Sequence, residues 1–261
     1  LLIRMAKYSV VLIPNSFMWW IMNSSDRMMV SAMISVTANG VYAVAYKIPT
    51  LLSTITTIFN QAWSYSAIRE DESEDKEEYN NRVYENLVTI VIVVATGLLM
   101  IMKPFLSVYV GKEYYTAWHY VPYLIVGFVF MTLGSFIATS YTVHKDSMGF
   151  LISGTVGAII NLILNFILIP MMGVSGAAFA TCISYFGVFV YRIKDTQKYI
   201  KLRVFKRKQI CGYALLILSA MTCYLDNCIG QTLLVIEFIC IILNKEFVKG
   251  MLKIIFKIKT N

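Results

Sequence analysis

The chain lacks nearly all the residue patterns on which metal sites, disulfide frameworks and nucleotide sites depend. It has only two histidines, and its five cysteines are scattered through apolar segments without a C-x-x-C pair. A disulfide framework or a metal site is therefore not expected, and no cofactor is predicted. A G-x-x-x-x-G-K-[ST] phosphate cradle is missing as well, so coupling to ATP would need another chain.

The sequence also lacks the alternation of apolar and polar positions that is typical of membrane strands. It has long apolar blocks instead, and 58% of its 261 residues are hydrophobic. Blocks of about 18 residues or more are too long for the core helices of a soluble domain, and they match the thickness of a bilayer. We therefore predict an all-α fold, a polytopic membrane helix bundle with about eight transmembrane helices.

Eight candidate spans follow from the apolar blocks and the polar breaks between them. They are roughly 8–33, 40–67, 84–110, 119–143, 148–170, 173–193, 209–226 and 229–244. The acidic run near 69–82 is better explained as a solvated extension of two long helices than as a docking surface. Because the first residues have neither a starting Met nor the pattern of a signal peptide, we expect a fragment of a longer chain.

If the helices alternate, most of the basic residues share one side of the membrane. Nineteen of the 23 Lys and Arg lie in the N-terminus, the loops near 69–82, 144–147 and 192–208, and the tail. The exceptions are Arg27, Lys47, Lys103 and Lys112. Because cytoplasmic loops retain basic residues, both termini are predicted to be cytoplasmic, in a multi-pass protein of the cell inner (cytoplasmic) membrane. Contact with anionic membrane lipids then explains the net charge of +8, and no nucleic-acid partner is expected.

Polar residues inside the second span share one face of the helix. This polar stripe recurs at spacings of three and four residues and consists of Lys47, Thr50, Thr54, Thr57, Gln61 and Ser64. For the threonines alone, hydrogen bonds between helices and a wet cavity explain the stripe equally well. Lys47 favours the cavity, because an ammonium roughly 10 Å below the outer surface needs water or a counter-charge. At the bilayer centre, a charge costs about 2.5–3.5 kcal/mol. Asp26 or a bound anion is the expected counter-charge.

Two further patterns concern helix faces. In the first span Asn15, Trp19, Asn23 and Arg27 recur at four-residue spacing, with Asp26 beside the last.

In the fifth span small and polar residues recur at the same spacing: Gly149, Ser153, Gly157, Asn161 and Asn165. Small residues let helices approach closely, so the two asparagines are expected to hold helices together rather than to contact a substrate. Pro170 with Gly173 predicts a tight hairpin into the sixth span.

Several segments, in order, resemble the C-terminal half of Wzx-type oligosaccharide flippases of the multidrug/oligosaccharidyl-lipid/polysaccharide (MOP) superfamily. The resemblance covers about residues 8–193 and rests on these pieces: Pro14 followed by "SSDRMMVSAMISVTANGVYAVAYKIP", then "FNQAW", "KPFLSVYVGKEYYTAWHYVPYL", "YTVHKDS" and "GAIINLILNFILIPMMGVSGAAFATCISY". Such proteins have two six-helix lobes around a central cavity. The resemblance implies a second six-helix lobe over 1–193, a basic cytoplasmic connector over 194–208, and two additional helices with a basic tail over 209–261, with the N-terminal lobe absent.

The function that the resemblance implies is translocation of a polyprenyl-diphosphate-linked oligosaccharide, for synthesis of O-antigen or another surface polysaccharide. Its implied partners are the lipid-linked oligosaccharide, membrane lipids, the missing lobe, a polysaccharide polymerase and glycosyltransferases. Arg27 and Lys47 are the candidates for holding the diphosphate, because basic side chains pair with phosphate oxygens. Asn23, Thr54 and Gln61 are the candidates for contacting sugars. Asp26 is a candidate ion-coupling residue, and the alternative is that it pairs with Arg27 or Lys47.

Three other functions stay open at this point. A multidrug exporter or a peptidoglycan-precursor flippase of the same superfamily would have the same predicted fold, although an exporter of cationic drugs should have acidic cavity walls. A membrane-embedded polysaccharide polymerase or ligase would belong to a different class and would need reactive residues in large external loops. The outward connections here are short and the histidines, His119 and His144, lie at span ends, so we do not expect an enzyme.

Overall fold

The computed structural model describes residues 2–71 and 73–225, with side chains described from Ile13 onward except those of Asn15 and Asn23. Over these residues the chain is helical and has no strand, which confirms the predicted fold class. The elements are α1 (Leu2–Met33), α2 (Val36–Glu70), α3 (Lys76–Tyr109), η1 (Lys112–His119), α4 (Val121–Val143), α5 (Ser147–Met172), α6 (Val174–Asp195), η2 (Thr196–Lys198) and α7 (Arg207–Thr222). The predicted eighth span, 229–244, lies outside the described residues.

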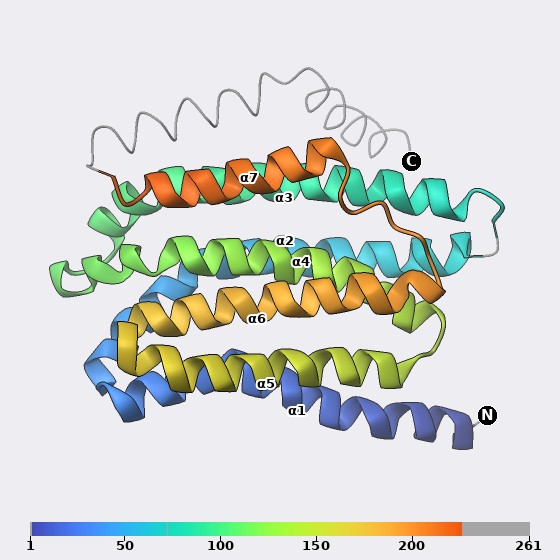
Figure 1. Ribbon diagram of the computed structural model, residues 1–261, viewed down its shortest axis with the longest axis horizontal. Coiled ribbons are helices and arrows are strands. Elements are labelled where there is room, and N and C mark those ends of the chain that lie inside the picture. Colours follow the sequence, from blue (N-terminus) through green and yellow to red (C-terminus); the bar gives the residue numbers. More distant parts are fainter. Residues whose placement is uncertain (1, 72, 226–261) are drawn as a thin grey trace.

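The long helices run alongside one another and alternate in direction, as the sequence predicts (Figure 1). One end, which we call the hairpin end, holds the α1–α2 turn, η1 and the α5–α6 turn. The other, the connector end, holds the α2–α3, α4–α5 and α6–α7 connections. The acidic run is largely helical, because α2 continues to Glu70 and α3 begins at Lys76.

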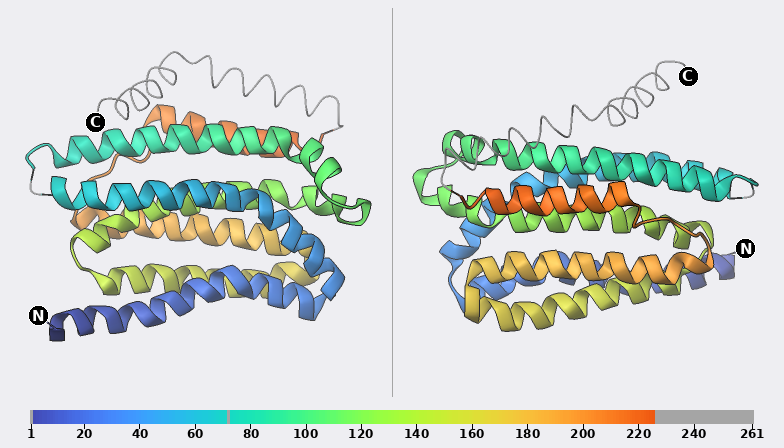
Figure 2. Two further views of the ribbon diagram at one scale, coloured as in Figure 1. Left: turned by 180° about the vertical axis from the view of Figure 1, so that it is seen from behind. Right: turned by 45° about the horizontal axis from the view of Figure 1, so that its top comes forward.

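The helices form two layers. Seen from behind, α1, α2 and α3 lie in front, and α5, α6 and α4 lie beyond them (Figure 2). Helix α6 packs between α4 and α5, while α1 packs on α5 and α2 packs on α4. Helix α7 packs on α3 and α4, so the first helix after the basic connector lies against the bundle.

Four helical segments in the described part of the chain are long and apolar enough to cross a membrane. They are Lys76–Tyr109, Val121–Val143, Ser147–Met172 and Val174–Lys198. Helix α2 is longer than any of these segments but carries the polar stripe, which lowers its hydropathy. Helix α7 has only 16 residues, fewer than the ~20 that a helix needs to cross the hydrocarbon core.

The α5–α6 hairpin depends on two glycines. Gly173 forms the turn with a φ of +61°, a conformation that costs other residues free energy because of their Cβ atom. Gly176 lies where α6 crosses the end of α5, and a Cβ atom there would overlap the carbonyl oxygen of Leu168. The predicted hairpin is confirmed, although α5 continues two residues beyond Pro170 before it turns.

At the connector end, side chains tie three connections together. The imidazole Nε2 of His144 lies 3.7 Å from a carboxylate oxygen of Asp71, and its ring stacks on Tyr199 with centroids 4.2 Å apart. The Tyr199 hydroxyl donates a 2.8 Å hydrogen bond to Asp146, which also accepts one from the backbone N–H of Gly149 and so caps α5. The α2–α3, α4–α5 and α6–α7 connections are therefore joined.

Candidate functional site

Asp26 is buried inside the bundle, toward the hairpin end, and is surrounded by hydrogen-bond donors. Its Oδ2 accepts hydrogen bonds from the hydroxyls of Tyr46 at 2.6 Å and Tyr42 at 2.8 Å, and its Oδ1 accepts one from the backbone N–H of Arg27 at 2.9 Å. The hydroxyl of Thr181 lies 3.1 Å from Oδ2. Charge-assisted hydrogen bonds of this kind are the usual way to keep a carboxylate inside a protein. Helices α1, α2 and α6 all contribute to this shell.

The predicted pairing of Asp26 with Arg27 or Lys47 is wrong, because neither side chain forms an ion pair with it in the described part of the chain. The Arg27 guanidinium lies over the ring of Tyr46, 4.7 Å from the centroid, and its Nε has no hydrogen-bond partner. Lys47 is exposed. The physical reason is that tyrosine hydroxyls already fill the space around the carboxylate.

The two asparagines of α5 extend this buried polar network. Asn161 and Asn165 are fully buried, and Asn161 Oδ1 accepts hydrogen bonds from Ser25 at 2.7 Å and from Asn165 at 3.0 Å. The amide of Asn161 also lies 3.5 Å from the Thr181 hydroxyl. The prediction that both asparagines point into protein is confirmed, and Asn161 holds α5 to α1, whereas Asn165 bonds to Asn161 within α5. The network joins α1, α5 and α6 to the shell of Asp26.

The polar stripe of α2 faces out of the bundle except at Ser64, which is partly buried. Lys47, Thr54 and Gln61 are exposed, together with Thr50 and Thr57. The threonine hydroxyls donate to carbonyls of their own helix, as in the 2.7 Å bond from Thr50 to Lys47. They therefore do not hold α2 to another described helix. On the opposite face of α2, Thr56 holds this helix to α4, because its hydroxyl lies 2.8 Å from that of Thr132. Asn23, the remaining predicted sugar contact, lies outside the described side chains.

Arg192 is a residue that the sequence interpretation missed, because it was counted with the basic loop near 192–208. Helix α6 continues to Asp195, and the Arg192 side chain is only 1% exposed inside the bundle. Its Nε donates to Ser153 at 3.1 Å and its Nη1 donates to the carbonyl of Gly134 at 3.0 Å, whereas its Nη2 has no partner. A usable signal was present, since Thr181, Val188 and Arg192 continue the buried face of α6 at helical spacing.

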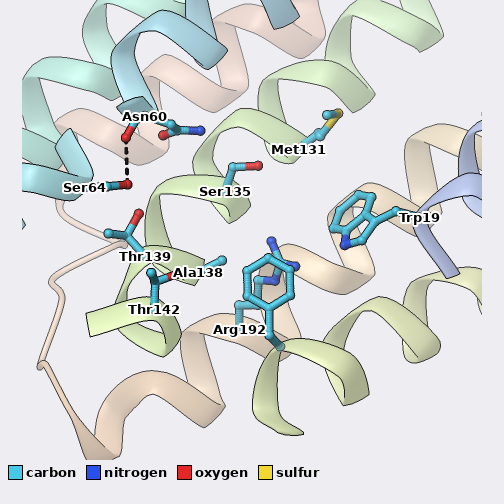
Figure 3. Close-up of a pocket in the computed structure, with 10 residues that line it drawn as sticks. Trp19, Asn60, Ser64, Met131, Ser135, Ala138, Thr139, Thr142 and Arg192 are labelled. Atoms are coloured by element: carbon cyan, nitrogen blue, oxygen red, sulfur yellow. Dashed lines mark hydrogen bonds between the residues drawn. The ribbon is translucent and has the colours of Figure 1, made fainter. Parts of the chain in front are cut away.

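Arg192 lines a cavity of about 290 Å³ between α1, α2, α4, α5 and α6. Its walls carry the rings of Trp19 and Phe150 and the polar groups of Asn60, Ser64, Ser135, Thr139 and Thr142. Asn60 and Ser64 lie across the space from Trp19, and Arg192 lies below them, as Figure 3 shows. The cavity shares no lining residue with the shell of Asp26.

Comparison with known proteins identifies the fold. Residues 2–119 match the model of a family described as "Polysaccharide biosynthesis protein". The chain is similar to a MOP superfamily transporter from Pyrococcus furiosus, with a TM-score of 0.60 and 18% identity over 84% of this chain and 52% of that one. The chain has the fold of half a MOP transporter. The predicted resemblance is thereby confirmed.

Two other solved structures are similar to the chain. The lipid II flippase MurJ in its inward closed conformation gives a TM-score of 0.63 and 16% identity, over 94% of this chain and 53% of that one. The MATE transporter VcmN of Vibrio cholerae in the bent form gives a TM-score of 0.59 and 18% identity, over 83% of this chain and 55% of that one. No curated protein matches the chain significantly by sequence. The chain spans about half the length of these transporters.

The helices and these similarities together identify a multi-pass membrane protein with a transporter fold. The similar proteins are described as transporters or flippases and as polysaccharide biosynthesis proteins, which agrees with the expectation that the chain is not an enzyme.

Proposed function

We propose that the chain forms the second lobe of a flippase that moves a polyprenyl-diphosphate-linked oligosaccharide across the cytoplasmic membrane for surface polysaccharide synthesis. The observation that carries the proposal is the outward-facing polar stripe of α2. Lys47, Thr54 and Gln61 are exposed over the middle of a helix that crosses the bundle from end to end. Against lipid, a lysine there costs about 2.5–3.5 kcal/mol, so the stripe requires water or protein beside it.

The missing neighbour is a six-helix N-terminal lobe in the same protein. Helices α1 and α2 lie in the same layer of the bundle, so such a lobe would enclose a wet space against them (Figure 2). In this proposal residues 1–193 are the lobe, 194–208 are a cytoplasmic connector and 209–261 hold two further helices and a basic tail. Alternating access by rocking of two lobes around a site between them is an established transport mechanism.

The wet space is positively charged on this side. Lys47 is exposed and Arg27 is half-buried, whereas Asp26 is withdrawn into the bundle. In our proposal Lys47 and Arg27 hold the diphosphate, and Asn23, Thr54 and Gln61 contact the sugars. Each threonine hydroxyl donates its hydrogen within α2 and still has a lone pair that can accept a hydrogen bond from a sugar hydroxyl. A cationic wall favours this substrate over a cationic drug.

Asp26 is our candidate for ion coupling, by a proton or by Na⁺. It is fully buried and unpaired with any cation in the described residues, and oxygen atoms of Tyr42, Tyr46 and Thr181 surround it. An outward movement of an anion is also favoured by an inside-negative potential, by about 2.3 kcal/mol per charge per 100 mV.

The test uses the complete protein with both lobes, expressed in a strain that lacks its own flippase. We expect Lys47→Ala and Arg27→Ala each to lower surface polysaccharide at equal protein level. Lys112→Ala is the matched control, because Lys112 is exposed in η1 and lies outside the stripe. Normal export by both stripe variants would remove these residues as substrate contacts. Restoration of export by residues 1–261 alone would refute the need for another lobe.

A further inference from the structure

The cavity around Arg192 is a second polar space, and among the residues of the polar stripe only Ser64, near the end of α2, lines it. None of its lining residues is Arg27, Lys47, Thr54 or Gln61. It lies toward the connector end, because Ser64 is near the end of α2, Thr142 near the end of α4 and Arg192 near the end of α6. In the orientation proposed above, this end faces the cytoplasm.

The electrostatics of the cavity point to an anion. Among the described residues that line it, Arg192 is the one with a charge, and none is a carboxylate. An arginine charge inside a bundle demands compensation, since desolvation of an ion costs several kcal/mol. The hydrogen bonds to Ser153 and Gly134 use two of its three nitrogens, and both partners are neutral. The unpartnered Nη2 leaves one edge of the guanidinium without a hydrogen-bond acceptor.

The other wall groups have the chemistry of a sugar site. Ser135, Thr139 and Thr142 supply hydroxyls, and the buried Oδ1 of Asn60 has no hydrogen-bond partner. Two aromatic rings flank the guanidinium, with its Cζ 5.3 Å from the centroid of Trp19 and 5.3 Å from that of Phe150. The volume is near the lower limit of about 300 Å³ for small-molecule pockets, which suits one ring rather than a chain of several.

We propose that this cavity binds one sugar unit that carries an oxyanion, with the anion on Arg192 Nη2 and the ring beside Trp19. The oxyanion is either the phosphate attached to the first sugar of the lipid-linked substrate or the carboxylate of an acidic sugar in the repeat. Both present oxygen acceptors to a guanidinium edge. The inference rests on the proposed function for the identity of the substrate, and it adds a binding site on the connector side of the lobe.

The direct test measures binding of small probes to the purified full chain in lipid nanodiscs by isothermal titration calorimetry, which reports on probes with and without carbon-bound protons. The probes are glucose 1-phosphate, glucuronate, neutral glucose and inorganic phosphate. We expect at least one of the two anionic sugars to bind at least tenfold more tightly than glucose and than inorganic phosphate. Binding of glucose 1-phosphate alone assigns the phosphate as the anion, and binding of glucuronate alone assigns an acidic sugar. Equal binding of glucose, or no binding of either anionic sugar, overturns the proposal.

Variants separate the role of Arg192 in binding from its role in packing. Arg192→Gln should weaken binding of the anionic sugar at least tenfold, and Arg192→Lys should restore part of it. Because Arg192 also joins α6 to α4 and α5, a second variant, Ser135→Leu, fills the cavity and leaves the bonds of Arg192 in place. The matched control is Arg82→Gln, whose arginine is exposed and pairs with Glu78. If Ser135→Leu binds the anionic sugar as tightly as the unmodified chain does, the sugar does not bind in this cavity.

Failure of this inference can be told apart from failure of the proposed function. The binding test needs no transport and no second lobe, whereas the stripe variants are tested by export in cells. Binding lost with Arg192→Gln together with normal export by the Lys47 and Arg27 variants would support this site and contradict the stripe. If neither anionic sugar binds and the stripe variants impair export, the proposed role of the stripe is supported and the sugar site at Arg192 is contradicted.

Discussion

The hydroxyl of Tyr46 lies 2.6 Å from Oδ2 of Asp26, and both residues are almost completely buried, with exposed fractions of 3% and 0%. Tyr46 also carries the guanidinium of Arg27 over its ring. Tyr46 thus contacts a buried carboxylate through its hydroxyl and a half-buried cation through the face of its ring. A change at Asp26 therefore alters charge inside the bundle, while a change at Tyr46 alters only how that charge is held.

We expect Asp26→Asn to abolish the dependence of transport on a proton or Na⁺ gradient, because the amide keeps the size of the side chain but cannot take up a cation by charge. The measurement is translocation of a lipid-linked oligosaccharide by the complete protein in vesicles, with each gradient imposed separately. Tyr46→Phe is the comparison, since it keeps the carboxylate and removes one hydrogen bond. It should retain the gradient dependence and lower the stability by about 1 kcal/mol. Unchanged gradient dependence in Asp26→Asn would exclude Asp26 as the coupling residue.

Gly176→Ala should destabilise the bundle by about 1–3 kcal/mol, the range for overpacking a close contact. The added Cβ atom would meet the backbone of Leu168, which cannot rotate away as a side chain could. Gly111→Ala is the control, because nothing lies within 4 Å of a Cβ atom there and its φ of −60° suits alanine. The difference in melting temperature between the two purified variants measures the effect. Equal melting temperatures would show that α5 and α6 can separate at this crossing.

Asp146 allows the charge and the helix cap to be tested separately. Partial burial raises the pKa of Asp146, but hydrogen bonds from the Gly149 backbone N–H, the Tyr199 hydroxyl and the Lys198 ammonium outweigh it and lower that pKa below its usual value. A group whose pKa is lowered by folding stabilises the protein above its unfolded pKa of 3.8, and the contribution is lost as the pH falls through the folded value.

We therefore expect the melting temperature to fall as the pH is lowered through and below about 4, and to fall less steeply in Asp146→Asn. Asparagine is a good N-cap, so this variant keeps the cap of α5 and loses only the charge. Asp146→Ala loses both and should be less stable than Asp146→Asn at neutral pH, by about 1 kcal/mol. Equal stability of the two variants at neutral pH would mean that the cap contributes nothing.

The helical spans were predictable because bilayer thickness and helix rise leave little freedom for apolar blocks of this length. The faces of Asn161 and Asn165 followed from four-residue spacing, which places side chains on one side of a helix whatever its surroundings. Spacing does not say which side chain on a neighbouring helix arrives there. For that reason the sequence paired Asp26 with nearby cations, whereas tyrosines from α2 and a threonine from α6 take that place.

The buried position of Arg192 could not be predicted for a different reason. Basic residues near the end of a span are usually placed in the flanking loop, and Lys194 and Lys198 follow closely behind it. Only tertiary packing, with small residues such as Ser153 and Gly134 facing it, gives the long side chain room inside the bundle. The amphipathic pattern of the polar stripe was predictable from the sequence, whereas what covers the stripe follows only from the proposed second lobe.

The contacts among Asp71, His144, Asp146 and Tyr199 have a mechanical consequence. They join the three connections at one end, while at the opposite end η1 packs on α2, α3 and α4 beside the hairpin at Gly173 and the short turn from α1 into α2. A displacement of any one of these connections is therefore passed to the other two. In the transport cycle proposed above, these three connections would therefore move together as one body.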